Sequence, residues 1–403
     1  MIKDFIKKFI PKFLLSWYHL GLAFLGAVMY GFPSRKLTVI GVTGTNGKTT
    51  VVNLTTGILE EAGFKVASLS SVMFKIGGKE RENTLKMTMP GRFKIQKFLR
   101  DAVSAGCKFA VLEVSSEGIR QHRHKFIDFS VAVFTNLTPE HIESHGGFEN
   151  YKAAKGKLFK DAKKVHVINI DDKNADYFLS FKAEKKYTFG WGKGDINTKN
   201  TSFSLPLLGK FNILNALAAI CVGLSQGVSL EICQKSLGKA KGVPGRMEVV
   251  ISEPFKVVVD YAVTPDALEQ LYRAIKELFS PKRLIAVLGS CGGGRDKWKR
   301  LVSGEIVAKH CQEIIITNED PYDEDPMAII NQIAEKAGSG ARKILDRREA
   351  IKQALLSAQP GDAVVVSGKG CEPWIMEAHG KKTPWDDRKV VREEYEKLRG
   401  SLK

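Results

Sequence analysis

The sequence has few cysteines and no pattern that would pair them. None of the six forms part of a C-x-x-C motif, and they are spread over positions 107, 221, 233, 291, 311 and 371. This spacing excludes a disulfide framework and a zinc site, and it is typical of reduced thiols in a cytosolic protein. Low-complexity tracts, internal repeats and recognisable nucleic-acid-binding modules are also absent, so nucleic acid is not expected among the partners.

The chain has fewer acidic residues than basic residues. The chain has 62 Lys and Arg against 44 Asp and Glu, which gives a formal net charge of +18 at pH 7. This charge favours anionic partners, which include nucleotides, phosphorylated intermediates and a membrane surface. The composition, with 43% hydrophobic and 26% charged residues, is that of a globular protein, and 403 residues suffice for two or three domains with full cores.

A glycine-rich loop organises the first half of the chain. Leu37-Thr38-Val39-Ile40 predicts a buried strand, Val51 to Ala62 predicts a helix, and Gly41-Val42-Thr43-Gly44-Thr45-Asn46-Gly47-Lys48-Thr49-Thr50 lies between them. Strand, glycine loop and helix together indicate a phosphate-binding loop, whose backbone N–H groups and helix N-terminus would hold phosphate oxygens. Lys48 would reach the outer phosphates, and the Thr49 hydroxyl would bind Mg²⁺.

Strands and helices alternate from residue 37 to about 243, which predicts a parallel sheet covered by helices on both faces. The run at 109–116 predicts a buried strand that ends in a carboxylate and two hydroxyls, those of Glu113, Ser115 and Ser116. Because ligands bind at the carboxyl ends of strands in open α/β sheets, we expect Glu113 to be a second Mg²⁺ ligand. The strand at 130–135 leads to His141, His145 and Lys155, which on their own are as consistent with a solvated surface as with a site.

Residues 244–403 repeat the alternation and predict a second, Rossmann-like α/β domain. Strands are expected at 246–250, 255–260, 283–289, 313–317 and 362–367, and helices at 264–279, 298–310, 325–337, 347–358 and 387–399. The run Gly289 to Gly294 follows a strand, but its spacing is not G-x-G-x-x-G, so it does not indicate a dinucleotide site.

The N-terminal segment, residues 1–36, contains an uncharged run at 13–32 of about one membrane span. No signal-peptide cleavage site is evident, and a single span with its basic end inside would place an ATP site outside the cell. Two interpretations stay open. The segment is either a membrane-surface anchor, which Trp17, Tyr18 and Tyr30 would suit, or a helix packed on its own protein.

Several motifs, in family order, resemble those of the Mur ligases of peptidoglycan synthesis, most nearly the UDP-N-acetylmuramoyl-tripeptide synthetases (MurE type). They are GTNGKTT, EVSS, FTNLTPEHIESHGGFENYKAAK, VINIDD, LLGKFNILNALAA, VPGRMEVV, DYAVTPDAL, GGGRDKWKR, DPYDEDP and SGKGCE, and they span about residues 38–400. The resemblance implies a central ATP-binding domain at 37–243 and a C-terminal amino-acid-binding domain at 244–403.

The resemblance implies an ATP-dependent, ADP-forming amide ligase. ATP phosphorylates a carboxylate on the growing peptide, and an amino acid's amine then displaces phosphate from the acyl phosphate. Lys48 and Mg²⁺ on Thr49 and Glu113 would neutralise the triphosphate. His141 resembles a ligand of a second Mg²⁺, and Lys155 stands where the family carries a carbamylated lysine that helps to hold that metal.

The resemblance also implies binding residues. ATP would be held by Gly44, Thr45, Asn46, Gly47, Lys48, Thr49, Thr50, Asn215, Arg246 and Asp260. The UDP-muramyl-peptide acceptor would contact Thr88, Ser115, Gln121 and Arg123, and the incoming amino acid would contact Arg295, Asp320, Gly368 and Glu372. Arg295 would pair with the amino acid's carboxylate, and Glu372 would receive a side-chain ammonium.

The sequence departs from the family in four places. The family's N-terminal UDP-binding domain, of roughly a hundred residues, is missing ahead of the loop. Tyr322 replaces the arginine of the D-N-P-R loop of diaminopimelate-adding members, which favours lysine or another diamino acid with one carboxylate. Glu117 and Val263 stand where the family has histidines, and Met89 replaces a threonine of the substrate loop.

The leading hypothesis is a ligase that adds a diamino acid such as L-lysine to a muramyl-dipeptide precursor in the cytoplasm, with contact at the inner face of the cytoplasmic membrane as an open alternative. Other hypotheses are a Mur-like ligase acting on a lipid-linked, folylpolyglutamate-type or polyamino-acid acceptor, and a non-catalytic ATP-binding scaffold. Retention of Lys48, Glu113, His141 and Lys155 disfavours the scaffold.

Overall fold

The computed structural model describes residues 12–401, which form two compact units. The first unit comprises residues up to 137 together with 148–206 and 212–240, and the second comprises 138–147, 207–211 and 241–403. Lys3, Lys7 and Lys8 of the predicted N-terminal anchor lie outside the described residues. The predicted domain division at residue 243 stays a prediction.

The first unit is built on a nine-stranded sheet with the order β4-β3-β2-β5-β1-β6-β7-β8-β9. Its strands pair in parallel except for the hairpin at one edge, where β3 pairs antiparallel with both β2 and β4. The strands are β1 (Thr38–Thr43), β2 (Val66–Leu69), β3 (Met73–Ile76), β4 (Lys79–Glu82), β5 (Phe109–Glu113), β6 (Phe129–Phe134), β7 (Val165–Asn169), β8 (Lys185–Gly190) and β9 (Ile196–Asn197). All four side chains of the edge strand β4 are charged and exposed.

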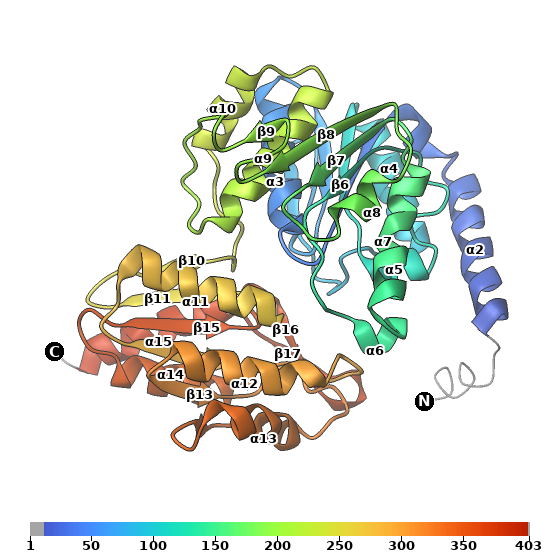
Figure 1. The fold of residues 1–403 in the computed structure, drawn as a ribbon. Helices are drawn as coiled ribbons and strands as arrows, with labels where there is room; N and C mark the ends of the chain where they lie inside the picture. Colours follow the sequence, from blue (N-terminus) through green and yellow to red (C-terminus); the bar gives the residue numbers. More distant parts are fainter. Residues whose placement is uncertain (1–11, 402–403) are drawn as a thin grey trace. The chain divides into compact units, whose positions relative to one another are not determined.

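Helices cover both faces of this sheet (Figure 1). Those on the first face are α3 (Lys48–Glu61), α9 (Phe211–Ser225) and α10 (Leu230–Gly238). Those on the second face are α4 (Arg92–Ser104), α5 (Ser116–Arg120), α7 (Phe148–Asp161) and α8 (Ala175–Leu179). Because β1 and β5 are covered on both sides, every residue of β5 is buried, as expected for a central parallel strand.

The apolar N-terminal run forms helix α2 (Lys12–Met29), followed by the short 3-10 helix η1 (Pro33–Lys36). Helix α2 packs beside α4 through small residues, since Ala23 and Ala27 are buried and a Cβ on Gly26 would contact the backbone of Arg92 and Phe93. Among the described residues, no helix is long and apolar enough to cross a membrane. The buried small residues show that α2 packs on its own protein, while Leu15, Leu20 and Leu22 are half-buried and other large side chains of α2 are exposed. The membrane-surface interpretation stays a prediction.

The second unit contains a six-stranded sheet with the order β10-β11-β15-β12-β13-β14, in which only β10 is antiparallel to its neighbour. Its strands are β10 (Glu248–Ile251), β11 (Lys256–Asp260), β12 (Leu284–Leu288), β13 (Glu313–Ile316), β14 (Arg342–Lys343) and β15 (Ala363–Ser367). A separate hairpin, β16 (Trp374–Met376) and β17 (Lys382–Pro384), encloses the 3-10 helix η2 (Ala378–Gly380). The short helix α6 (Ile142–His145) also belongs to this unit.

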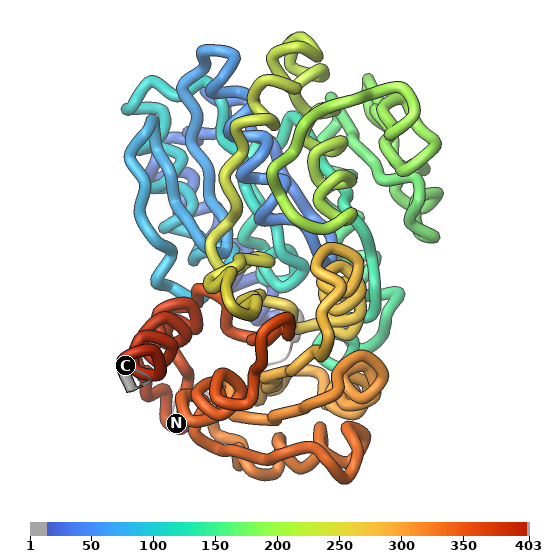
Figure 2. Tube along the Cα trace, turned by 90° about the vertical axis from the view of Figure 1, so that its left-hand side faces the viewer, coloured from blue at the N-terminus to red at the C-terminus, as the bar shows by residue number. Residues whose placement is uncertain are grey.

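Two helical layers sandwich the second sheet. One apolar core joins it to α11 (Pro265–Phe279), α12 (Trp298–His310) and α13 (Pro326–Ala337), and the other joins it to α14 (Arg347–Ser357) and α15 (Asp387–Ser401). Figure 2 shows these layers from the side, with α12 and α13 in orange and α15 in red. The predicted fold class is confirmed, with a parallel-sheet domain that carries the glycine loop and a Rossmann-like α/β unit after it.

Candidate active site

The glycine loop joins β1 to α3 in a conformation that only glycine allows at two positions. Gly44 and Gly47 have positive φ values of 151° and 83°, and a Cβ on either would clash, with Thr135 Oγ1 and with Asn215 Oδ1 respectively. The side chain of Asn136 accepts a hydrogen bond from Asn46 N (2.9 Å) and so fixes the tip of the loop. Helix α3 begins at Lys48, so its N-terminus faces the space that a phosphate group would fill.

A hydroxyl and a carboxylate meet beside this loop. Thr49 Oγ1 donates a hydrogen bond of 2.9 Å to Glu113 Oε2, and both side chains are buried. Lys48 Nζ lies 4.0 Å from Glu113 Oε1. Oxygen ligands next to an anion-binding loop are what Mg²⁺ requires, so Thr49 and Glu113 fit the metal that the sequence predicted.

Ser71 belongs to this group although the sequence reasoning did not select it. Its N–H and its hydroxyl donate to the two oxygens of Glu113, at 2.9 and 3.0 Å. Its Oγ also lies 2.8 Å from Thr88 Oγ1, so a chain of hydrogen bonds connects Thr88 to the carboxylate of Glu113, the predicted Mg²⁺ ligand. The sequence feature that could have identified Ser71 is its position just after the strand β2. The carboxyl ends of parallel strands meet at one edge of a sheet, where ligands bind.

Two lysines reach the backbone of the loop. Lys48 Nζ donates to Gly44 O (3.1 Å) and Thr45 O (2.8 Å), and Lys155 Nζ donates to Gly44 O at 2.7 Å. Lys155 is 2% exposed and lies 4.5 Å from the ring centroid of Tyr151, whose hydroxyl is 3.1 Å from Thr45 Oγ1. Lys155 on α7 is thus held against the glycine loop, and its carbamylation stays a prediction.

The predicted acceptor residues form a compact polar group in the first unit. Arg123 donates to Gln121 Oε1 (2.8 Å) and to the carbonyl of Met89, and Gln121 donates to Glu117 Oε1 (2.6 Å). Met89 and Glu117 are two of the positions that depart from the family, so those departures lie in direct contact with the predicted acceptor residues. Ser115 caps α5 by accepting from Gly118 N at 3.1 Å.

The remaining predicted ATP contacts are divided between the units. Asn215 and Thr50 belong to the first unit, where Asn215 lies against Gly47 and Thr50 is in the first turn of α3. In the second unit, the guanidinium of Arg246 stacks 4.2 Å from the ring centroid of Tyr261. Asp260, at the end of β11, accepts from Met247 N at 2.6 Å, and burial raises the pKa of its carboxyl.

His141 lies in the second unit, in a segment tied to the C-terminal region. Asp296 accepts hydrogen bonds from Ile142 N and Glu143 N, both at 3.0 Å, and Lys299 pairs with Glu140 at 3.2 Å. His141 has a left-handed backbone conformation, with φ of 57°, and its ring is 6.4 Å from that of His145. Because Lys155 belongs to the first unit, the shared metal predicted for His141 and Lys155 stays a prediction.

The predicted amino-acid contacts gather in loops at the carboxyl ends of β12, β13 and β15. Lys369, which has no exposed surface, donates to Asp320 Oδ1 (2.8 Å) and to Glu372 Oε2 (2.7 Å). Burial alone would lower the pKa of Lys369, but the two carboxylates outweigh burial and raise it, so the lysine is charged. A side-chain ammonium arriving at Glu372 would share that carboxylate with Lys369, a partner that the sequence reasoning missed.

A buried arginine fixes two of these loops. Arg347 on α14 donates to the carbonyl oxygens of Asn318 (3.2 Å) and Ser367 (2.9 Å), and its charge is paired with Asp387 at 2.7 Å. Asn318 lies two residues before the predicted contact Asp320, and Ser367 directly precedes the predicted contact Gly368. Gly368 has φ of 111°, and a Cβ there would lie 2.8 Å from Glu319 Oε2, so only glycine fits.

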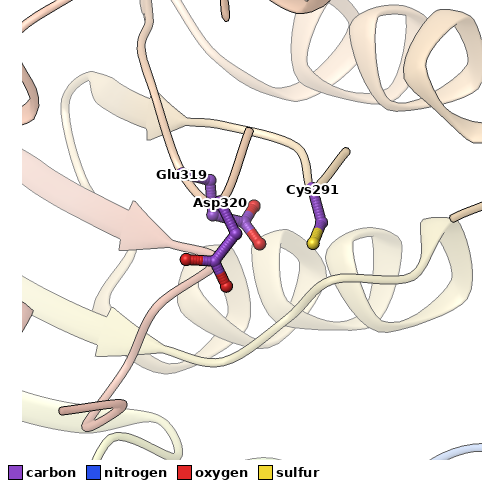
Figure 3. Close-up of side chains that lie close together, drawn as sticks. All are labelled: Cys291, Glu319 and Asp320. Atoms are coloured by element: carbon purple, nitrogen blue, oxygen red, sulfur yellow. The ribbon is translucent and has the colours of Figure 1, made fainter. Parts of the chain in front are cut away.

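Cys291, Glu319 and Asp320 bring one sulfur and two carboxylates within 4.8 Å of one another (Figure 3). Burial and the neighbouring Glu319 raise the pKa of the Cys291 thiol to about 12, so it stays protonated at neutral pH. A protonated thiol is a poor metal ligand, and Asp320 already pairs with Lys369. The trio therefore lies beside residues predicted to contact the amino acid and is not assigned to a metal. Arg295, on the loop after Cys291, has exposed surface, and it interacts electrostatically with Cys291, Tyr261 and Tyr322.

A cavity of about 410 Å³ lies away from the nucleotide loop. Its lining residues are Lys65, Phe74, Ile76, Gly77, Lys79, Glu80, Arg81 and Ala105, which surround the hairpin of β3 and β4. No predicted site residue lines this cavity, so we assign it no part in binding ATP, the acceptor or the amino acid.

Two family profiles match the chain. The profile described as Mur ligase middle domain matches residues 42–223, and the profile described as Mur ligase, glutamate ligase domain matches residues 245–370. The chain belongs to the Mur ligase family. Mur ligases are ATP-dependent, ADP-forming amide ligases that use Mg²⁺, which agrees with the oxygen ligands beside the loop.

The similar curated Mur ligases are longer than this one. A UDP-N-acetylmuramoyl-L-alanyl-D-glutamate–2,6-diaminopimelate ligase of Syntrophomonas wolfei is 40% identical, over 95% of this chain and 82% of its own. A UDP-N-acetylmuramyl-tripeptide synthetase of a Roseiflexus species is 37% identical, over 95% of this chain and 83% of its own. The resemblance to tripeptide synthetases is thereby confirmed.

Solved structures agree with this assignment. The structure of a UDP-N-acetylmuramoyl-L-alanyl-D-glutamate–2,6-diaminopimelate ligase is 32% identical, with a TM-score of 0.59 over 90% of this chain and 79% of that one. A folylpolyglutamate synthase of Mycobacterium tuberculosis has a TM-score of 0.72 but only 19% identity, over 87% of this chain and 92% of that one. At that identity the likeness establishes a shared fold alone.

Proposed function

We propose that this Mur ligase joins a diamino acid to the terminal carboxylate of a UDP-linked muramyl-dipeptide precursor. The observation that carries the proposal is the 40% identity to a ligase named for this reaction, over 95% of this chain. The hydrogen bond between Thr49 and Glu113 beside the glycine loop supports it. The acceptor carboxylate would attack the γ-phosphorus of ATP, release ADP and become an acyl phosphate. The amine would then attack the acyl carbon, lose a proton and displace phosphate.

The chain's own residues would manage the charge in this reaction. Lys48 and the N–H groups at the start of α3 would bind the triphosphate, and Glu113 would stay fixed by its bonds to Thr49 and Ser71. Mg²⁺ held by Thr49 and Glu113 would neutralise negative charge on the phosphates. Thr88 would place the acceptor next to this carboxylate through Ser71.

Two diamino acids compete as the incoming substrate. The names of similar relatives favour meso-diaminopimelate over the lysine expected from the sequence, and we take diaminopimelate as the leading candidate. Tyr322 favours lysine, since it replaces the arginine that would bind a second carboxylate. Its ring lies against Gly293, and burial raises the pKa of the phenol, so it supplies a neutral hydroxyl and no positive charge.

The deciding experiment measures ADP release and product mass with Mg-ATP and UDP-MurNAc-L-Ala-D-Glu, each amino acid being supplied separately. Turnover with meso-diaminopimelate is the expected result, and Lys48→Ala should abolish it, whereas Lys182→Ala, an exposed lysine, should not. Turnover with L-lysine alone would assign specificity to Tyr322. ATP binding without turnover on any amino acid would overturn the proposal in favour of a lipid-linked or other carboxylate acceptor.

We also propose that the enzyme works in the cytoplasm at the inner face of the membrane. A separate proposal is that Lys155 is carbamylated and helps His141 to hold a second Mg²⁺. The 2% exposure of Lys155 and its contact with the nucleotide loop support the carbamylation. Mass spectrometry of the intact protein in bicarbonate should detect an added carbon dioxide that Lys155→Ala lacks. Wild-type protein without that addition would contradict the carbamate.

A further inference from the structure

Helix α2 presents its large apolar residues outward. Among the described residues, twelve large hydrophobic side chains are exposed, and seven of these belong to this single helix. They are Leu14, Trp17, Tyr18, Phe24, Leu25, Val28 and Met29, and the exposed fraction reaches 70% for Trp17 and 67% for Met29. We call this set the outer face of α2. Exposed apolar surface concentrated in this way marks an interaction site.

The inner contacts fix which way α2 faces. The small residues Ala23, Gly26 and Ala27 lie toward α4, and Ser16 Oγ is 2.8 Å from His122 Nε2. A helix that served only to complete the core would bury its leucines and aromatics, since each buried side chain of this kind contributes about 1.5–3 kcal/mol. Here three leucines of α2 are half-buried and Phe24 touches Phe126, but most of the outer face, led by Trp17 and Met29, is left for a partner outside the described structure.

Basic residues flank the outer face in the sequence. Residues 1–36 contain six basic residues (Lys3, Lys7, Lys8, Lys12, Arg35 and Lys36) and one acidic residue (Asp4), a net charge of 6 − 1 = +5. Arg35 and Lys36 on η1 are exposed, and the neighbouring helix α4 exposes Lys94, Lys97 and Arg100. Two copies of this chain would bring like charges together at this face, which disfavours a second copy as its partner.

We propose that the outer face of α2 binds an anionic lipid surface, with the helix lying along the surface. Trp17 and Tyr18 suit the headgroup region, the aliphatic side chains would enter the acyl boundary, and the surrounding lysines and arginines would attract the lipid charge. An in-plane arrangement agrees with the absence, among residues 12–401, of a helix able to cross a membrane. This contact is independent of the amino acid that the ligase adds.

The test is co-sedimentation of the full-length protein with vesicles of phosphatidylcholine alone or of phosphatidylcholine with phosphatidylglycerol. We expect binding to the anionic vesicles that weakens as salt rises. Trp17→Ser/Leu25→Ser/Met29→Ser should weaken it at least about tenfold, because the lost apolar contacts supply most of the affinity. The matched control is Leu278→Ser/Leu345→Ser/Leu356→Ser, three exposed leucines of the second unit, and it should bind like the wild type.

Other outcomes would overturn the proposal. Failure of the wild type to bind either vesicle type, or equal loss in both triple variants, would exclude a lipid site on α2. A dimer seen by light scattering that is lost only in the α2 variant, without vesicle binding, would assign the outer face to a second copy. ADP release by both variants shows whether they are folded and keeps this test separate from that of the ligase.

Discussion

At the scale of single residues, the predicted site residues are held by hydrogen bonds before any substrate arrives. Glu113 is bonded to Thr49 and Ser71, and Lys369 is bonded to Asp320 and Glu372. Polar groups that are oriented in advance do not have to reorganise during the reaction, which is how a buried site stabilises developing charge. Two substitutions test this directly.

Lys155→Ala should lower turnover about hundredfold, the scale seen when a group that supports a metal ligand is removed. Formate or another short carboxylate should restore part of the rate, because it would replace the carbamate. Lys157→Ala is the control, since Lys157 lies on the same helix and is exposed. The measurement is the rate of ADP release with and without formate. Unchanged turnover in Lys155→Ala would exclude the carbamate and indicate a different mechanism.

Lys369→Met should raise KM for the amino acid at least about tenfold, while KM for ATP changes less than about threefold. Loss of the buried cation would leave Asp320 and Glu372 uncompensated, and unpaired buried charges also reduce stability by about 3–5 kcal/mol. Steady-state kinetics with each substrate varied, together with the melting temperature, separate the two effects. Lys389→Met, at an exposed lysine, is the control. A variant with a lower melting temperature but unchanged KM for the amino acid would limit Lys369 to a structural role.

At the scale of helices and strands, the elements that could be predicted are those with long periodic patterns. The helix at 298–310 has the predicted bounds, and the strands at 109–113 and 363–367 begin within a residue of the prediction. The hairpin of β3 and β4 was missed because Lys79-Glu80-Arg81-Glu82 shows no apolar alternation. This strand lies at the edge of the sheet and pairs with β3 on one side. Ser71 and Lys369 were missed for a related reason, since their partners are set by sheet register and loop contact.

An ion cluster between α11 and α12 should make stability depend on pH. Burial alone would raise the pKa of Glu269, but hydrogen bonds from Lys309, His310 and Arg273 outweigh it and lower that pKa to about 2. A depressed carboxyl pKa adds stability above the unfolded value near 4.5, and this contribution is lost as pH falls toward 2. After allowance for solvent screening, Glu269→Gln should cost about 1–2 kcal/mol at pH 7 and almost nothing near pH 2.

Urea unfolding of the wild type and Glu269→Gln at several pH values between 2 and 7 measures this difference. Glu277→Gln is the control on the same helix, because Glu277 is half exposed and has a single lysine partner. A difference in unfolding free energy that stays constant across the pH range would contradict the assigned pKa.

At the scale of the whole molecule, each unit has its own sheet and apolar core. Sequence order alone does not reveal which residues belong to which unit. Residues 138–147 belong with the second unit through Asp296, a partner 154 positions away from Ile142. The family resemblance indicated which residues serve the nucleotide and which serve the amino acid. Contacts of this sequence separation depend on the completed fold, so the grouping of His141 with the second unit could not be predicted.

Nucleotide binding should stabilise the molecule only when the metal ligands are intact. Mg-ADP at about a hundred times its Kd adds about 2.7 kcal/mol to folding, which corresponds to a rise in melting temperature of roughly 3 °C or more. The rise should vanish with EDTA and in Glu113→Gln, whereas Glu184→Gln, an exposed surface control, should keep it. Thermal unfolding followed by circular dichroism makes the measurement. An equal rise in Glu113→Gln would contradict the role assigned to Glu113.

The edge strand β4 has a consequence for how the protein behaves at high concentration. An edge strand leaves a row of backbone N–H and C=O groups that another chain can extend into a continuous ribbon, which is a common start of aggregation. In β4 each position is a lysine, a glutamate or an arginine with its side chain in solvent, and covering it with another strand would strip water from four charges. The β4 edge of the nine-stranded sheet is thus protected against extension by a strand of another chain.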